Sequence, residues 1–339
     1  MSAESPAHRR RDRVATLRDT LEARQIELYL AAVAAAAVMA LAVPGTAALE
    51  QGINPALALM LFVTFLQVPL RDLAQAFTRG RFLAALMAVN FLAIPLLVAG
   101  LTRLLPADLM LRLGVLMVLL TPCIDYVVTF AHLGRADARA LLASTPALLL
   151  AQMALLPVYL TLFLGADAGR FVQVGPFLHA FGWLIALPLA AAGAVQAWSA
   201  RSRLGRRAAT SLGLLPVPAT ALVLFFVIAA VVPRLGPGWN AAARALPVYL
   251  AFAALAPLIG WGAGRVFRLD APTGRTLAFS AATRNSLVVL PLAFAVPGGV
   301  PLLPAVIVTQ TLIELMSELL YVRLIPRLGR PSVGPASAP

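Results

Sequence analysis

The chain has very little of the polar chemistry that enzymes and metal sites use. Among its 339 residues there are one cysteine, three histidines and no lysine, so all 27 basic side chains are arginine. A single cysteine excludes an internal disulfide and a cysteine-cluster metal site. The sequence also contains no nucleophile–base pair, metal-ligand cluster or phosphate-binding loop. We therefore predict a protein that is not an enzyme and that needs no cofactor.

Charge is also scarce, and long apolar segments take its place. Charged residues make up 12% of the chain and hydrophobic residues 61%, with a mean hydropathy of +0.88. A soluble protein of this composition would expose large apolar patches. Apolar runs of about 18–25 residues separated by short polar breaks are typical of membrane-spanning helices. We predict ten, at residues 27–44, 55–70, 82–102, 109–132, 140–164, 177–198, 211–233, 246–266, 276–296 and 301–323.

The arginines alternate from loop to loop. Most lie before the first predicted helix or after helices 2, 4, 6, 8 and 10, and the opposite loops hold only Arg103, Arg112, Arg170, Arg234 and Arg244. By the positive-inside rule, this predicts a multi-pass protein of the inner or plasma membrane with both termini in the cytoplasm. Nucleic-acid binding, which the net charge of +13 could suggest, needs one continuous basic face and is excluded by this topology.

Short patterns recur in the same order in the two halves of the chain. PALALMLF at Pro55 returns as PATALVLF at Pro218, 163 residues later, and PALLLAQ at Pro146 returns as PAVIVTQ at Pro304, 158 residues later. A proline in the third predicted helix has a counterpart 162 residues later in the eighth. The repeating unit is five helices, an odd number, so its two copies must cross the membrane in opposite senses. Inverted repeats of this kind are typical of secondary transporters, whose site lies between the copies at the bilayer midplane.

These patterns predict the domain organisation. A basic cytoplasmic tail at residues 1–25, without a cleaved signal peptide, precedes the first repeat at 26–170. The second repeat occupies 171–326, and a disordered cytoplasmic tail occupies 327–339. The fold class is an all-α integral membrane protein of ten helices in two inverted repeats.

The fourth and ninth predicted helices are interrupted by polar residues and proline near their centres. Helix 4 holds Thr121, Pro122, Cys123 and Asp125, and helix 9 holds Ser280, Thr283, Arg284, Asn285 and Ser286. Proline removes a backbone donor, and unpaired backbone at this depth is tolerated only against protein or a watery cavity. We therefore predict two unwound segments that form a substrate site, with Thr121, Pro122, Cys123, Thr283, Arg284, Asn285 and Ser286 as the binding residues.

A buried arginine is costly in a membrane unless it is paired. Glu314 is the best partner for Arg284 in the sequence and Asp125 the second. Glu318 follows Glu314 by one turn and could instead reach the cytoplasmic interface near Arg323.

Several of these residues also have purely structural interpretations. The pairing of Arg284 with Glu314 could be only structural, Cys123 could be a small packing residue, and Asp125 could cap a half-helix. Four amides are more readily interpreted as interhelical hydrogen-bonding groups than as ligands: Gln67, Asn90, Gln152 and Gln310.

Three stretches resemble the bile acid/sodium symporter superfamily and, within it, the arsenite-permease-like branch. They are TPCIDYVVTFAHLGRADARALL (121–142), FSAATRNSLVVLPLA (279–293) and VIVTQTLIEL (306–315), and the resemblance extends over residues 26–326. It implies ten helices in two inverted repeats, a panel and a core domain, and helices 4 and 9 that cross where they unwind.

The resemblance also implies a substrate. Arsenite-carrying members have one cysteine in the fourth helix, and Cys123 matches it; soft sulfur suits thiophilic arsenite. Sodium-coupled members have an acid and a glutamine near the helix 9 crossing, where this chain has Ser280 or Ala281 and Arg284. The sodium site is therefore interpreted as lost, because a guanidinium remains charged. We predict arsenite or antimonite efflux by proton antiport through Glu314 or Asp125. The alternative is a sodium- or proton-coupled carrier of an organic or inorganic anion held by Arg284.

Overall fold

The computed structural model describes residues 16–67, 79–124, 126–165, 182–299 and 302–329, and in these ranges the chain is helical and has no β-strand. The α-helices are α2 (Gln25–Ala42), α3 (Ile53–Gln67), α5 (Gly80–Ala88), α6 (Ile94–Leu101), α7 (Leu109–Leu119), α8 (Val127–Leu133), α9 (Ala138–Leu164), α12 (Leu187–Arg201), α13 (Arg203–Leu212), α14 (Pro216–Val231), α15 (Leu235–Val266), α16 (Ala271–Ala282), α17 (Ser286–Ala295) and α18 (Leu302–Leu324). Short 3₁₀ or π turns extend them: η1 (Thr46–Gly52), η2 (Val89–Ala93), η3 (Thr102–Leu104), η5 (Gly182–Ala186), η6 (Val232–Arg234) and η7 (Ile325–Arg327).

Each of the ten predicted apolar segments contains helix, but not all are continuous spans. Within the described residues, five helices are long and apolar enough to cross a membrane, or seven if two bent pairs each count as one span. The other predicted spans are the two interrupted ones and the one that begins in η5, whose predicted first residues, 177–181, lie outside the described residues. The protein is therefore an all-helical membrane protein, and the number of ten crossings stays a prediction.

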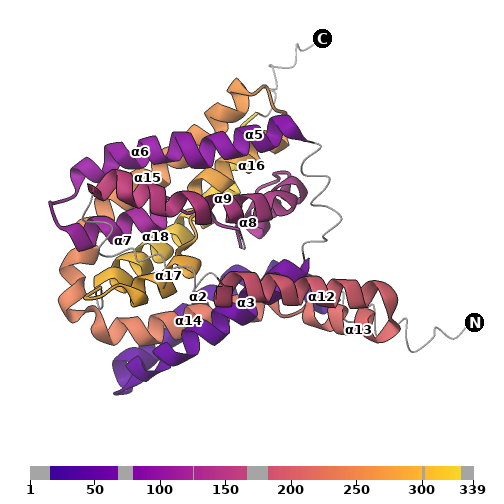
Figure 1. Cartoon of the computed structure of the whole chain (residues 1–339), viewed down its shortest axis with the longest axis horizontal. Helices are drawn as coiled ribbons and strands as arrows, with labels where there is room; N and C mark the ends of the chain where they lie inside the picture. Colours follow the sequence, from indigo (N-terminus) through magenta and orange to yellow (C-terminus); the bar gives the residue numbers. More distant parts are fainter. Residues whose placement is uncertain (1–15, 68–78, 125, 166–181, 300–301, 330–339) are drawn as a thin grey trace, which may run out of the picture.

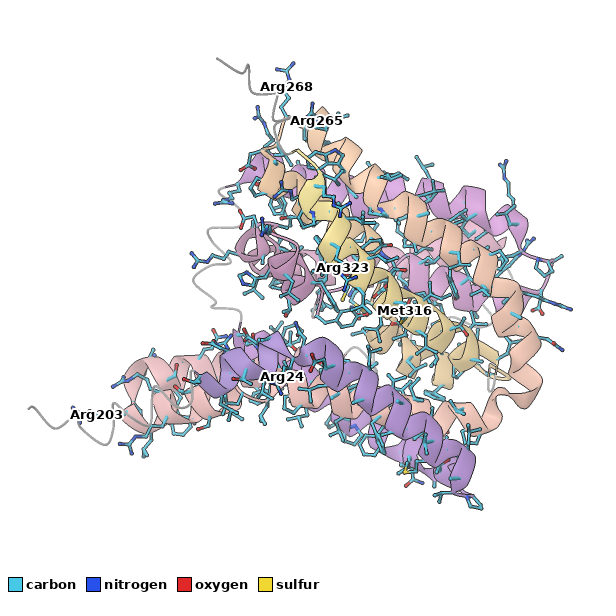
Figure 2. The ribbon with its side chains drawn as sticks, turned by 180° about the vertical axis from the view of Figure 1, so that it is seen from behind. Arg24, Arg203, Arg265, Arg268, Met316 and Arg323 are labelled. Carbon is cyan, nitrogen blue, oxygen red and sulfur yellow. The ribbon has the colours of Figure 1, made fainter. Side chains whose placement is uncertain are left out.

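The helices form two groups in space (Figure 1). One is a layer of α2, α3, α12 and α14, extended by α13, and the other is a larger bundle of α5–α9 and α15–α18. The first half of the chain supplies α2 and α3 to the layer and then α5–α9 to the bundle. The second half supplies α12 and α14, with α13 between them, to the layer and then α15–α18 to the bundle. Arg203 lies at the tip of the layer, whereas Arg265 and Arg268 lie at one end of the bundle (Figure 2).

The start of the seventh predicted helix needs a correction. Residues 211–233 were expected to form one span, but α14 begins at Pro216 and α13 is a separate helix that meets it at 44°. Proline favours the first turn of a helix, where its missing donor costs nothing. Ser202 begins α13, because its side chain accepts hydrogen bonds from the backbone N–H groups of Leu204 and Gly205. The arginine-rich stretch here was interpreted as a loop, and it is an amphipathic helix instead.

Two local features of the bundle position the site. Pro95 has no N–H to donate to the Phe91 carbonyl, and the chain forms the π turn η2 there; the hydroxyl of Tyr159 donates to that carbonyl instead (2.5 Å). Asn90 lies in this turn. Helices α15 and α16 pack backbone to backbone, since a Cβ on Gly260 would lie 2.3 Å from the Leu277 oxygen. This contact fixes the end of α16 in the middle of the bundle.

Candidate functional site

Both predicted interruptions are present, and the two unwound segments pair with each other. Helix α7 ends at Leu119 and α8 begins at Val127, while α16 ends at Ala282 and α17 begins at Ser286. The Cys123 N–H donates to the Thr283 carbonyl (3.0 Å), and the Asn285 N–H donates to the Thr121 carbonyl (2.8 Å). This makes one antiparallel bridge centred on Pro122 and Arg284. Backbone groups freed by the interruptions are thus partly satisfied across the crossing.

The crossing brings together all the predicted binding residues. All seven are buried: Thr121, Pro122, Cys123, Thr283, Arg284, Asn285 and Ser286. The side chain of Asn285 accepts from the Val288 N–H (3.4 Å) and begins α17, and the hydroxyl of Ser286 accepts from that of Thr311 (2.9 Å). Asp125, the second coupling candidate and a predicted helix cap, lies outside the described residues.

The guanidinium of Arg284 is fully buried and is held by oxygen atoms at helix ends. Its Nη2 donates to the carbonyls of Ser280 (2.5 Å) and Ala281 (2.8 Å) in the last turn of α16. Nη1 donates to the carbonyl of Leu119, the last residue of α7 (3.4 Å). The side-chain oxygen of Asn90 in η2 accepts from Nη2 at 2.9 Å.

These contacts place a positive charge where two helix dipoles end. The carboxyl end of a helix carries partial negative charge on its unsatisfied carbonyls, which favours a nearby cation. The face of the Phe252 ring, 5.5 Å from the guanidinium carbon, adds a cation–π contact. The side chains of Arg284 and Glu314 form no salt bridge within 4.0 Å, although their opposite charges still attract each other across the crossing. Carbonyl dipoles and one amide take the place of the carboxylate.

Glu314 instead holds the backbone of the crossing. One oxygen accepts from the Arg284 N–H (2.6 Å) and from the Gln310 side chain (2.5 Å). The other accepts from the Tyr126 hydroxyl (2.5 Å). Tyr126 is a residue of the crossing that the sequence prediction missed, although its position at the start of α8, directly after the first break, was a usable signal. Three hydrogen-bond donors stabilise the charge of a buried carboxylate and fix the position of Glu314 in the crossing.

The position of Glu318 is a second correction. The sequence allowed it to reach the interface near Arg323, but it is fully buried, and its Oε1 atom lies 2.6 Å from the hydroxyl oxygen of Thr283. Arg323 is exposed. Position i+4 after Glu314 keeps Glu318 on the same, inward face of α18, and one turn is not enough to carry it out of the bundle.

The four amides give different results. Asn90 and Gln310 make interhelical or intrahelical hydrogen bonds at the site: Asn90 donates to the Ser280 hydroxyl (2.9 Å) and Gln310 donates to Glu314. Gln152 is buried but has no hydrogen-bond partner among the residues that the structure describes, so its predicted bond is not present there. For Gln67 the prediction stands untested.

A match to a protein-family model shows how the chain is related to known proteins. The model of the sodium bile acid symporter family matches residues 54–235, which is more than half of the 339 residues. The chain belongs to this family. It is therefore a multi-pass membrane transporter for small solutes. No curated protein matches the chain. The match contains the first break but ends before α16, so it says nothing about Arg284, Glu314 or Glu318.

Proposed function

We propose that this chain is a proton-coupled secondary transporter of the plasma membrane that exports arsenite or antimonite. Its site is the crossing of the two unwound segments, its two termini are cytoplasmic, and the helices form two inverted repeats of five. The layer of α2, α3, α12 and α14 is the panel domain, and the bundle is the core domain that moves against it. Glu314 carries the coupling proton, with Asp125 as a second candidate.

The observation that supports proton coupling over sodium coupling is the position of the Arg284 guanidinium. In secondary transporters, half-helix carboxyl ends and unwound carbonyls coordinate Na⁺ near the midplane. Here the carbonyls of Leu119, Ser280 and Ala281 accept from a guanidinium instead. A tethered cation cannot be exchanged with solution, so this position is closed to a coupling Na⁺. The buried carboxyl of Glu314 is then the group that can bind and release an ion, namely a proton.

The substrate assignment depends on Cys123. Its side chain is fully buried at the crossing in this conformation, next to the carbonyl of Thr283. A thiolate sulfur is a soft ligand and suits As(III) or Sb(III) better than oxygen groups do. A single thiol binds weakly enough for the substrate to leave. Three thiolates would hold it too long for a carrier.

An organic or inorganic anion is the alternative substrate, and the name of the family favours it. Arg284 would be the group that binds the anion. Its Nη atoms are already committed to four oxygen acceptors, and only Nε has no partner among the described residues. An anion would have to displace helix carbonyls from the guanidinium, which makes this function the weaker proposal.

Flux into proteoliposomes tests both parts of the proposal. We expect arsenite flux to follow an imposed pH gradient and to ignore a Na⁺ gradient of the same size. We also expect Cys123→Ser to lose that flux while retaining wild-type expression and thermal stability. Flux that follows Na⁺ and ignores pH would contradict the coupling. Unchanged arsenite flux in Cys123→Ser, together with flux of an organic anion such as taurocholate, would favour the alternative.

A further inference from the structure

Glu318 is a fully buried carboxyl group for which the proposed transport cycle has no role. It lies one turn after Glu314 on α18, and the Thr283 hydroxyl approaches its Oε1 atom at 2.6 Å. Its Oε2 atom has no hydrogen-bond partner among the residues that the structure describes. Glu318 therefore touches the same unwound segment as Glu314, with fewer donors around it.

Among the residues that the structure describes, no cation compensates the charge of an ionised Glu318. Two ionisable groups face it from its own helix, Glu314 one turn before and Tyr321 one turn after, and Tyr321 donates to the Ala253 carbonyl (2.5 Å). No basic side chain of the described residues lies within 4.0 Å of it. On the elements packed against α18, the other ionisable groups bond elsewhere (Arg112, Tyr126, Tyr249, Arg284), are exposed (His132, Arg244, Arg265, Arg327) or lie buried at the crossing (Cys123).

The hydrogen bonds of the Thr283 hydroxyl indicate whether Glu318 is protonated. Its oxygen lies 2.8 Å from the Phe279 carbonyl and 2.6 Å from Glu318 Oε1. A carbonyl oxygen and an ionised carboxylate can only accept, and the hydroxyl has a single proton to donate. Both contacts are full hydrogen bonds when Thr283 donates to Phe279 and a protonated Glu318 donates to the Thr283 oxygen. The geometry thus favours a neutral carboxylic acid at Glu318.

Charge burial leads to the same result. An ionised Glu318 would have one hydrogen bond, one bare oxygen and a second carboxyl group one turn away. A buried charge with so little compensation is strongly unfavourable, and like charges in one site cannot both ionise readily. Glu314 differs, because three donors surround it.

We propose that Glu318 binds a proton in this conformation and is a second proton-binding residue of the coupling site. The assignment to coupling rests on the proposed function, whereas the bound proton does not. The two carboxyl groups hold consecutive residues of one break, Glu314 through the Arg284 N–H and Glu318 through the Thr283 hydroxyl. When the break moves and water enters, the O–H bond of Glu318 breaks and its proton passes to water. The ionised carboxylate then accepts a hydrogen bond from the Thr283 hydroxyl, which keeps its proton and turns away from the Phe279 carbonyl.

Infrared spectroscopy of the purified full-length protein tests the bound proton without any substrate. At neutral pH we expect a carboxylic-acid C=O band that shifts in D₂O, is absent from Glu318→Gln and persists in Glu314→Gln. Glu22→Gln, at a side chain that is 40% exposed, is the matched control and should leave the band unchanged. A wild-type protein without the band, or a band that persists unchanged in Glu318→Gln, would overturn the proposal. Thr283→Ala gives a second measurement, since the band should remain but change frequency when its partner is removed.

Flux measurements test the coupling role. The amide of Glu318→Gln can donate to Thr283 as the protonated acid does, so the variant mimics a permanently protonated carrier. We expect it to retain arsenite exchange across the membrane but to lose, by about 10-fold or more, net flux driven by a pH gradient. Wild-type net flux in Glu318→Gln would overturn the coupling role. If the wild-type protein moves no arsenite at all, the proposed function fails, while the infrared result still decides the bound proton.

Discussion

The two unwound segments have the same backbone plan but different side chains. Thr121 and Thr283 each donate a hydroxyl hydrogen bond to the carbonyl four residues earlier, of Met117 and Phe279, and each accepts at its own carbonyl from the other segment. They are 162 residues apart, the same offset as Pro95 and Pro257. The pairs Pro122 with Arg284 and Cys123 with Asn285 share this offset. The crossing is thus two-fold symmetric in its hydrogen bonds, as an internal repeat predicts.

The difference lies in what each copy places on that backbone. In the described residues, the first segment supplies a proline and a thiol, and the second supplies a guanidinium and an amide. The described part of the first segment therefore offers a soft sulfur ligand, and the second segment holds a buried cation and contacts both carboxyl groups of α18. Symmetric backbones allow one copy to specialise in cargo and the other in coupling. Substitutions in the two segments test this division.

Arg284→Gln should have the largest effect. It removes the buried cation and leaves carbonyls at two helix ends without their donor, so we expect a loss of about 3–5 kcal/mol in stability. Net arsenite flux under a pH gradient should fall at least about 100-fold, or ~2.7 kcal/mol in barrier height. Na⁺, compared with choline, should raise the thermal stability of this variant and not of the wild type.

The exposed Arg265→Gln is the matched control and should change neither flux nor stability. An Arg284→Gln protein that retains wild-type flux and pH dependence would show that the guanidinium is only a packing element. The division between the two segments would then be lost, because the second would contribute no charge to transport.

Glu314→Gln should uncouple the carrier and leave it folded. The amide keeps the shape of the carboxyl group but cannot carry a proton, and one of the three donors around it loses its acceptor. We expect flux driven by a pH gradient to fall about 100-fold and arsenite exchange to change by less than about 10-fold. Paired measurements of net flux and exchange in the same vesicles separate the two. Equal losses in both would indicate a positioning role instead of coupling.

The sequence predicts the interruptions well because their causes are local. Pro122 removes a helix donor wherever it stands, and apolar runs and alternating arginines are visible without coordinates. The partners of Arg284 and the burial of Glu318 could not be predicted, since they depend on which face of α18 turns inward and on carbonyls that no sequence letter marks. Asn90 shows the same limit, because the π turn before Pro95 sets its direction.

Cys123→Ser and Cys123→Ala test whether the thiol of the first segment binds the substrate or only fills space. If the thiol binds the substrate, both variants should raise the KM for arsenite about 10-fold or more. Alanine tests the packing alternative, because it keeps a small apolar side chain and should stay within about 1 kcal/mol of wild-type stability. The thermal unfolding of both variants and their flux at several arsenite concentrations are the measurements. A normal KM in Cys123→Ala would assign the cysteine to packing.

Thr121→Val and Thr283→Val compare the two segments at their most similar position. Each removes one hydroxyl and keeps the shape, so each should cost about 1 kcal/mol of stability, the smallest effect predicted here. The two hydroxyls have different neighbours among the described residues: that of Thr121 bonds to the carbonyls of Met117 and Val118, whereas that of Thr283 also contacts Glu318. Thr283→Val should therefore shift the pH dependence of flux, and Thr121→Val should not. Equal pH profiles in the two variants would mean that the second segment has no special part in proton coupling.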